Sequence, residues 1–193
     1  MYSKAKIAGH PIHPMVVVFP IALYTATVAA LLAFLATADS FYYRAAMVAS
    51  LAGVAMALVA VIPGAIDLLA LPRYSRARAT AIRHASFAVL TTGIFAVCGA
   101  LLFRGWTGRV MVDGRWDLDA TIPLAVGVVG LVTLVIVGVL GWTLVQTHHV
   151  GIKPALVKAD IPSREPELED SYPDLPTPPL TLPRRAPGPI TLH

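Results

Sequence analysis

Long apolar runs separated by short polar segments dominate this chain as far as residue 152. A helix of roughly 17–25 apolar residues crosses the hydrocarbon of a bilayer, and four of the runs reach that length. They occupy about residues 15–38, 45–62, 85–103 and 122–145, and the second can extend past Pro63-Gly64 to Leu71. Because the connections between them are short, the pattern predicts an all-α fold for residues 1–152, an integral membrane four-helix up-down bundle.

The first run has two features of a secretory signal peptide. Lys4 and Lys6 precede it, and it ends in Ala-Thr-Ala at residues 36–38. However, it exceeds the roughly 7–15 apolar residues of such a peptide. We therefore interpret it as a retained transmembrane helix.

Small residues recur at four-residue spacing in every run. In the fourth run the glycines return to one helical face, and they are Gly127, Gly130, Gly138 and Gly141. Lipid tails are as apolar as leucine, so helices in a bilayer associate where small side chains allow close approach. These faces are the predicted packing surfaces of the bundle.

Composition and charge support the membrane assignment and orient it. The chain is 56% hydrophobic and 13% charged, whereas soluble domains average about 25% charged residues. Eight Lys and Arg side chains flank the helix ends nearest the two termini, and four flank the opposite ends. The positive-inside rule then places both termini in the cytoplasm. On the other side, Asp113-Gly114 predicts a small hairpin.

Residues 153–193 differ from the rest of the chain, because they hold ten of its sixteen prolines. Such a segment buries too little apolar surface to fold alone, and its prolines favour extended polyproline II. We expect a disordered or extended cytoplasmic tail. The alternative is a strap that binds across a partner subunit.

Five histidines and one acid fall at a single set of helix ends in an up-down bundle. These residues are His10, His13, Asp67, His84, His148 and His149. Imidazole is the commonest metal ligand and also an axial ligand of haem iron. Axial ligands approach haem from opposite faces, so a haem would pair His10 or His13 with His84 or His148. If residues 10–13 are helical, His10 and His13 share a face and one small metal could take both.

Two alternatives to a ligand site remain open. Histidines at membrane interfaces also bond to headgroups, water or free carbonyls at helix ends. Asp67 follows Pro63-Gly64, where the second helix is expected to break or kink. Its carboxylate is a candidate metal ligand, but the favoured interpretation is a structural ion pair with Arg73, Arg83 or His84.

Three motifs resemble a bacterial four-span membrane family catalogued as a domain of unknown function. They are GHPIHPMVVVFPIAL, VIPGAIDL with a downstream Arg-His, and GWTLVQTHHVGI, and the resemblance covers about residues 7–152. It matches His10, His13, His84 and His148. It departs at Val18, where many members have a further histidine, and at Gln146 and His149, which replace tyrosine and glycine.

The resemblance implies a membrane redox setting, since similar domains occur fused to Rieske or c-type cytochrome modules. The single cysteine of this chain excludes a Cys-x-x-Cys-His haem attachment and a two-cysteine Rieske set. An electron would therefore need a non-covalent haem b or a partner protein. The resemblance also implies a bacterial inner membrane.

Our leading hypothesis is a haem b or transition-metal site near the cytoplasmic face, in an electron-transfer or quinone-linked membrane component. The candidate ligands are His10, His13, His84 and His148, with Asp67 added for a metal. The alternative is a non-catalytic accessory subunit of a larger membrane redox complex or a homo-oligomer. A metal or proton transporter ranks last, since no ionisable residue falls at mid-bilayer.

Enzyme activity of the chain by itself is not expected. The sequence has no nucleophile elbow, Gly-rich phosphate loop or zinc-protease motif. The net charge of +4 is explained by the cytoplasmic loops, so nucleic acid is not an expected partner.

Overall fold

The computed structural model describes residues 4–8 and 10–150, all within one compact unit, Met1–Pro154. This part of the chain contains four long helices: α1 (Ile12–Thr37), α2 (Ser40–Leu69), α3 (Arg76–Thr107) and α4 (Thr121–Gln146). All four are long and apolar enough to cross a membrane. The predicted all-α membrane bundle is confirmed, while the Pro-rich tail lies outside the described residues.

The second and third helices extend beyond the apolar runs that predicted them. α3 begins at Arg76, nine residues before the predicted span, because the Ser75 hydroxyl accepts a hydrogen bond from the Arg78 amide and caps its first turn. α2 continues through Pro63 and ends at Leu69. This end agrees with the extension of the second run towards Leu71. Of the break or kink expected at Pro63, the break does not occur: proline lacks the amide for one helix hydrogen bond, but the helix continues and Pro63 is buried.

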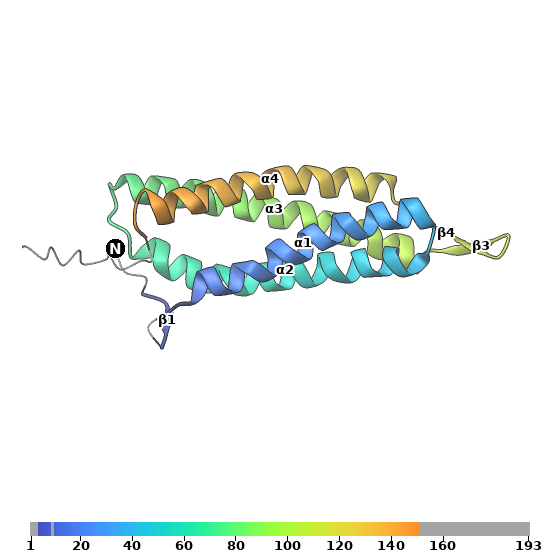
Figure 1. Cartoon of the computed structure of the whole chain (residues 1–193), viewed down its shortest axis with the longest axis horizontal. Helices are drawn as coiled ribbons and strands as arrows, with labels where there is room; N and C mark the ends of the chain where they lie inside the picture. Colours follow the sequence, from blue (N-terminus) through green and yellow to red (C-terminus); the bar gives the residue numbers. More distant parts are fainter. Residues whose placement is uncertain (1–3, 9, 151–193) are drawn as a thin grey trace, which may run out of the picture. The chain divides into compact units, whose positions relative to one another are not determined.

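The helices run up and down between two ends of the bundle (Figure 1). The histidine end holds the starts of α1 and α3 and the ends of α2 and α4. The hairpin end holds the α1–α2 turn and the pair β3 (Val110–Val112) and β4 (Arg115–Asp117), which turns at Asp113-Gly114 as predicted. A second short pair, β1 (Lys6–Ile7) and β2 (His10–Pro11), precedes α1.

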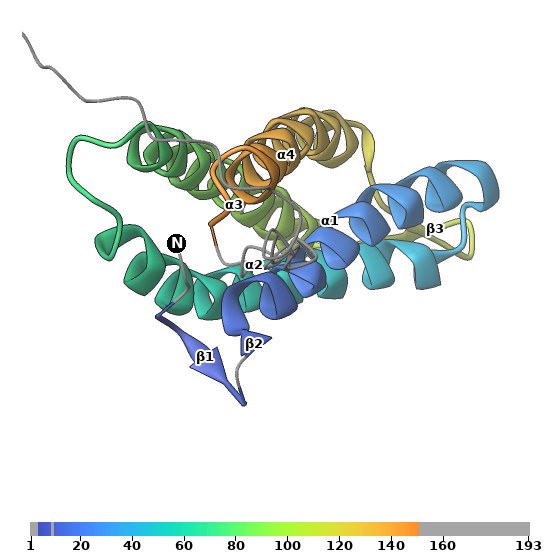
Figure 2. The same cartoon turned by 60° about the vertical axis from the view of Figure 1, so that its left-hand side comes forward.

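Each helix packs most closely on its partner within a helical hairpin. The contacts of α1 with α2 and of α3 with α4 are the most extensive, followed by α2 with α3 and α1 with α4. α1 and α3 therefore lie diagonally across the bundle, and Figure 2 shows the α1–α2 and α3–α4 hairpins as two layers.

In the core, aromatic rings pack against glycines of the neighbouring helices. The rings of Tyr24 and Phe95 stack with centroids 4.0 Å apart and planes inclined by 5°. A Cβ at Gly53 would lie 2.6 Å from Tyr24, and one at Gly130 would lie 2.6 Å from Phe95. Small residues thus form the packing surface in part. Gly53 and Gly130 do so, whereas an added Cβ at Gly138 would have no neighbour within 4 Å, and Ala22, Ala26 and Ala100 of the four-residue patterns are exposed.

Candidate functional site

His13 lies in the first turn of α1 and crosses to the neighbouring helix. Its Nδ1 is 3.0 Å from the carbonyl oxygen of Ala60 in α2. The ring then rests on Gly64, one turn further along α2, where a Cβ would lie 2.8 Å from Cε1 of His13. A larger residue than glycine would displace the ring from this position.

His84 makes the same contacts in the other half of the bundle. Its Nδ1 is 3.1 Å from the carbonyl oxygen of Val137 in α4. The ring lies beside Gly141, again one turn further on, where a Cβ would be 3.3 Å from Cε1 of His84. Each histidine therefore joins the two helices of its own hairpin.

The two rings meet across the diagonal of the bundle. Their centroids are 6.4 Å apart and their planes are inclined by 84°. A carbonyl oxygen only accepts hydrogen bonds, so each Nδ1 carries the proton and donates it. In the neutral tautomer, Nε2 then holds a free lone pair. Neither Nε2 has a hydrogen-bond partner in residues 4–8 and 10–150. Both rings are half-buried.

The other predicted ligands have different surroundings. His10 is exposed in β2, with its Nδ1 3.0 Å from the Ala8 carbonyl oxygen. The helix that would place His10 and His13 on one face does not include His10, because α1 begins only at Ile12, after Pro11. His148 follows α4 and lies 3.3 Å from the Thr80 hydroxyl through its Nε2. His149 has a left-handed backbone with φ of 50°.

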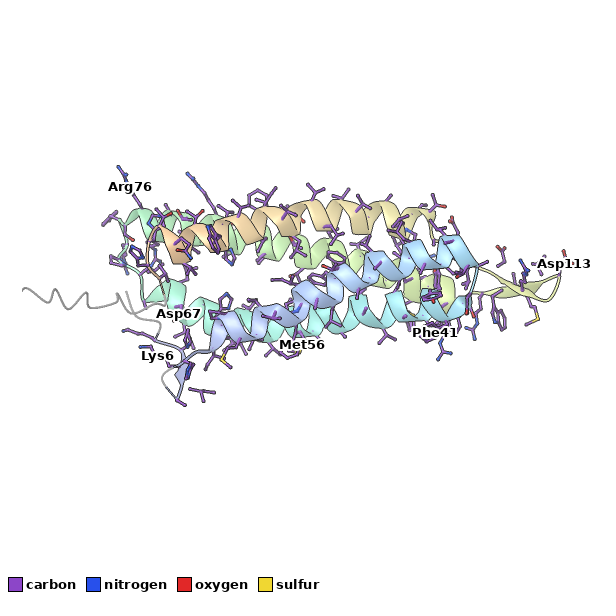
Figure 3. The ribbon with its side chains drawn as sticks, viewed as in Figure 1. Lys6, Phe41, Met56, Asp67, Arg76 and Asp113 are labelled. Atoms are coloured by element: carbon purple, nitrogen blue, oxygen red, sulfur yellow. The ribbon has the colours of Figure 1, made fainter. Side chains whose placement is uncertain are left out.

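Asp67 holds the segment that leads into α1. Its Oδ1 accepts hydrogen bonds from the backbone amides of Lys4, at 2.9 Å, and Ala5, at 3.3 Å. The Ala5 carbonyl in turn accepts from the Ile12 amide at the start of α1. Figure 3 shows Asp67 and Lys6 at the same end of the bundle. These contacts give Asp67 a role in positioning the residues just before His13.

A multidentate metal site is not formed by these groups. Among the residues that the structure describes, no group of three or more His, Cys, Asp or Glu side chains is arranged to hold a metal ion. The structure instead brings together His13 and His84. The backbone carbonyls of Ala60 and Val137, which orient both rings, were not anticipated. A glycine four residues after each carbonyl is the sequence signal that accompanies them.

Comparison with protein families matches residues 9–154 to a family described as predicted membrane protein (DUF2231). The match covers most of the chain, so the chain belongs to this family, which confirms the resemblance of its motifs to a four-span family of unknown function. The description names no activity, ligand or partner. Searches of curated proteins and of solved structures each found no match.

Proposed function

We propose that this membrane protein binds haem b between His13 and His84 and serves in electron transfer. The observation that carries the proposal is the pair itself. Two imidazoles from diagonal helices face each other, and each is fixed through Nδ1 to a helix carbonyl. Histidines that ligate metals generally donate their other ring N–H to a carbonyl or carboxylate in this way.

The separation of the rings would allow both histidines to hold one iron ion. Bonds from imidazole nitrogen to metal ions are about 2 Å long, and a ring centre lies about 1.1 Å behind its nitrogen. Two imidazoles on opposite sides of one ion would thus have centroids about 6.2 Å apart. The observed value is 6.4 Å. Ordinary T-shaped ring pairs fall at about 4.5–7 Å as well, so the spacing supports the proposal through its combination with the Nδ1 bonds.

The number of ligands favours haem over a bare metal ion. Protein sites for single transition metals use three or four side chains, and no such group occurs among the described residues. The porphyrin supplies four of the six iron ligands itself, so two histidines complete the coordination. We therefore keep His10, His148 and Asp67 outside the ligand set.

The chain's own residues orient and restrict the site. The Ala60 and Val137 carbonyls hold the Nδ1 protons, so Nε2 of each ring keeps the lone pair that an iron ion could take. Gly64 leaves room for the His13 ring. When bound, haem would supply a reversible one-electron couple. If both histidines held the iron, its coordination would be complete, which would favour electron transfer over oxygen chemistry.

The distribution of charge supports a cytoplasmic position for the histidine end in a bacterial inner membrane. Lys4, Lys6, Arg76, Arg78 and Arg83 all lie near that end. By the positive-inside rule, such clusters stay on the cytoplasmic side. An electron donor or acceptor would then meet the site from the cytoplasm or from a quinone in the bilayer.

The test is an absorption spectrum of the detergent-purified protein, oxidised and dithionite-reduced, after expression with a haem precursor. We expect a Soret band that is lost in H13A and H84A and kept in the matched controls H10A and H148A. Size-exclusion profiles separate ligand loss from unfolding, and imidazole added to H84G should restore the band. Absence of haem from the folded wild type, or a band that survives H13A/H84A, would overturn the proposal. If the folded wild type contains no haem and H13A and H84A are both less stable than it, the accessory-subunit alternative is supported.

A further inference from the structure

We infer that the chain is a fused pair of equivalent helical hairpins, α1–α2 and α3–α4, which share a single ligand site at the histidine end. The first evidence is the register between α1 and α3. Adding 71 to the residue number converts His13 to His84 and Tyr24 to Phe95. Both of these pairs meet across the bundle: the planes of the histidine rings are inclined by 84°, and the aromatic rings are stacked.

The register between α2 and α4 is equally constant. Adding 77 converts Ala60 to Val137, whose carbonyls accept from the two histidines. The same step converts Gly64 to Gly141, beside the two histidine rings. It also converts Gly53 to Gly130, which support the two stacked rings. Thus every contact of the site in one hairpin has its counterpart in the other.

Burial follows the same two registers. Of the six buried residues in α1, five correspond to buried residues in α3. The five pairs are Pro20/Thr91, Tyr24/Phe95, Thr27/Cys98, Val28/Gly99 and Leu31/Leu102. All three buried residues of α4 correspond to buried residues of α2, and these pairs are Ala46/Pro123, Ser50/Gly127 and Gly53/Gly130. A chance likeness of two hairpins would not match the buried residues of α1 with those of α3 by one constant number, and those of α2 with those of α4 by another.

The symmetry axis runs along the bundle. α1 and α3 both run from the histidine end to the hairpin end, so the hairpins are parallel repeats related by an axis along the membrane normal. The axis passes between the two histidine rings and between the two stacked rings. A ligand on this axis would meet equivalent groups of the two hairpins on its two sides.

The hairpin end has lost this equivalence. Phe34 and Tyr43 are large and buried in the first hairpin, and their counterparts in the second are Gly105 and Ala120. The Tyr43 hydroxyl lies where a Cβ of Gly105 would be placed. Phe34, Tyr43 and Ala120 belong to one hydrophobic cluster. Large side chains of one half thus fill the space left by small ones of the other, and this end is closed.

One ligand per chain follows, and this part of the inference rests on the proposed function. Only the histidine end keeps matching ligands, carbonyls and glycines. Pyridine haemochrome assay against protein concentration should give one haem per chain, and two per chain would overturn the single site. Absence of haem would instead refute the proposed function, and the duplication is decided by a separate measurement.

That measurement exchanges the large and small residues between the hairpins of the full chain. F34G/Y43A should lower the apparent Tm by about 10 °C or more, because it opens two cavities. Adding G105F and A120Y should restore at least half of this loss, since the aromatic rings return from the equivalent positions. The matched control adds the same rings one turn away, as F34G/Y43A/L101F/L124Y, and should restore none. Equal stability of the exchange variant and the control would overturn the duplication.

Discussion

Replacing Gly64 by alanine tests the contact between α2 and the His13 ring. The new Cβ would lie 2.8 Å from Cε1 and 3.0 Å from Nδ1 of His13, whereas carbon atoms prefer about 3.5–4.0 Å. The ring must move by about 0.7 Å, which strains its 3.0 Å hydrogen bond to Ala60. Overpacking costs about 1–3 kcal/mol and the hydrogen bond about 0.5–1.5 kcal/mol. Alanine regains up to about 1 kcal/mol of helix propensity, so the net loss is about 0.5–4.5 kcal/mol.

Two other glycines serve as graded controls in a thermal unfolding assay in detergent. A Cβ at Gly141 would lie 3.3 Å from His84, and one at Gly138 would meet nothing within 4 Å. We expect G64A to lower the apparent Tm by about 5 °C, G141A to change it little, and G138A to leave it equal or higher. In an H13A background the cost of G64A should disappear, because the ring it displaces is absent. The reasoning is refuted if G64A is as stable as G138A, or if its cost persists without the ring.

Three further predictions concern contacts outside the histidine pair. The buried Ser50 hydroxyl donates to the Phe95 carbonyl at 2.8 Å, so S50A should lose about 0.6–1.7 kcal/mol in unfolding titrations; an unchanged midpoint would contradict this. D67A removes the acceptor for the Lys4 and Ala5 amides, so trypsin should cleave after Lys6 faster, as followed by mass spectrometry; an unchanged rate would argue against that anchor. The Thr121 amide, which donates to Asp119, lowers the pKa of that exposed carboxyl. The ionised Asp119 therefore stabilises the fold above the unfolded pKa of about 3.9, and this stabilisation is lost as pH falls through the lower folded pKa. Unfolding measured against pH should show this acid-dependent loss in the wild type and not in D119N.

Helix number, order and membrane character followed from the length of the apolar runs, because a bilayer requires helices of nearly fixed length. The start of α3 could not be predicted from the apolar runs. Its first turns, from Arg76 to Arg83, carry polar residues and are held by a cap and by packing. The spacing of His10 and His13 places them on one face only if both are helical. Helix α1 starts between them and leaves His10 in a strand, because Pro11 precedes its first turn.

The up-down topology was enough to predict that His13 and His84 lie at one end of the bundle, whereas the duplication could be recognised only from atomic contacts. Few residues are identical at the two registers, and Leu31/Leu102 is one of the matches. In helices made mostly of Ala, Val, Leu and Ile, such matches arise at many offsets and select none. The hydrogen bonds of the two histidines to Ala60 and Val137 remove this ambiguity, because each fixes one residue of α1 or α3 against one residue of α2 or α4. Once these two bonds set the additions of 71 and 77, every other pair of equivalent residues is determined. The symmetry is therefore detected from the contacts, because the sequence pattern alone does not select these two numbers.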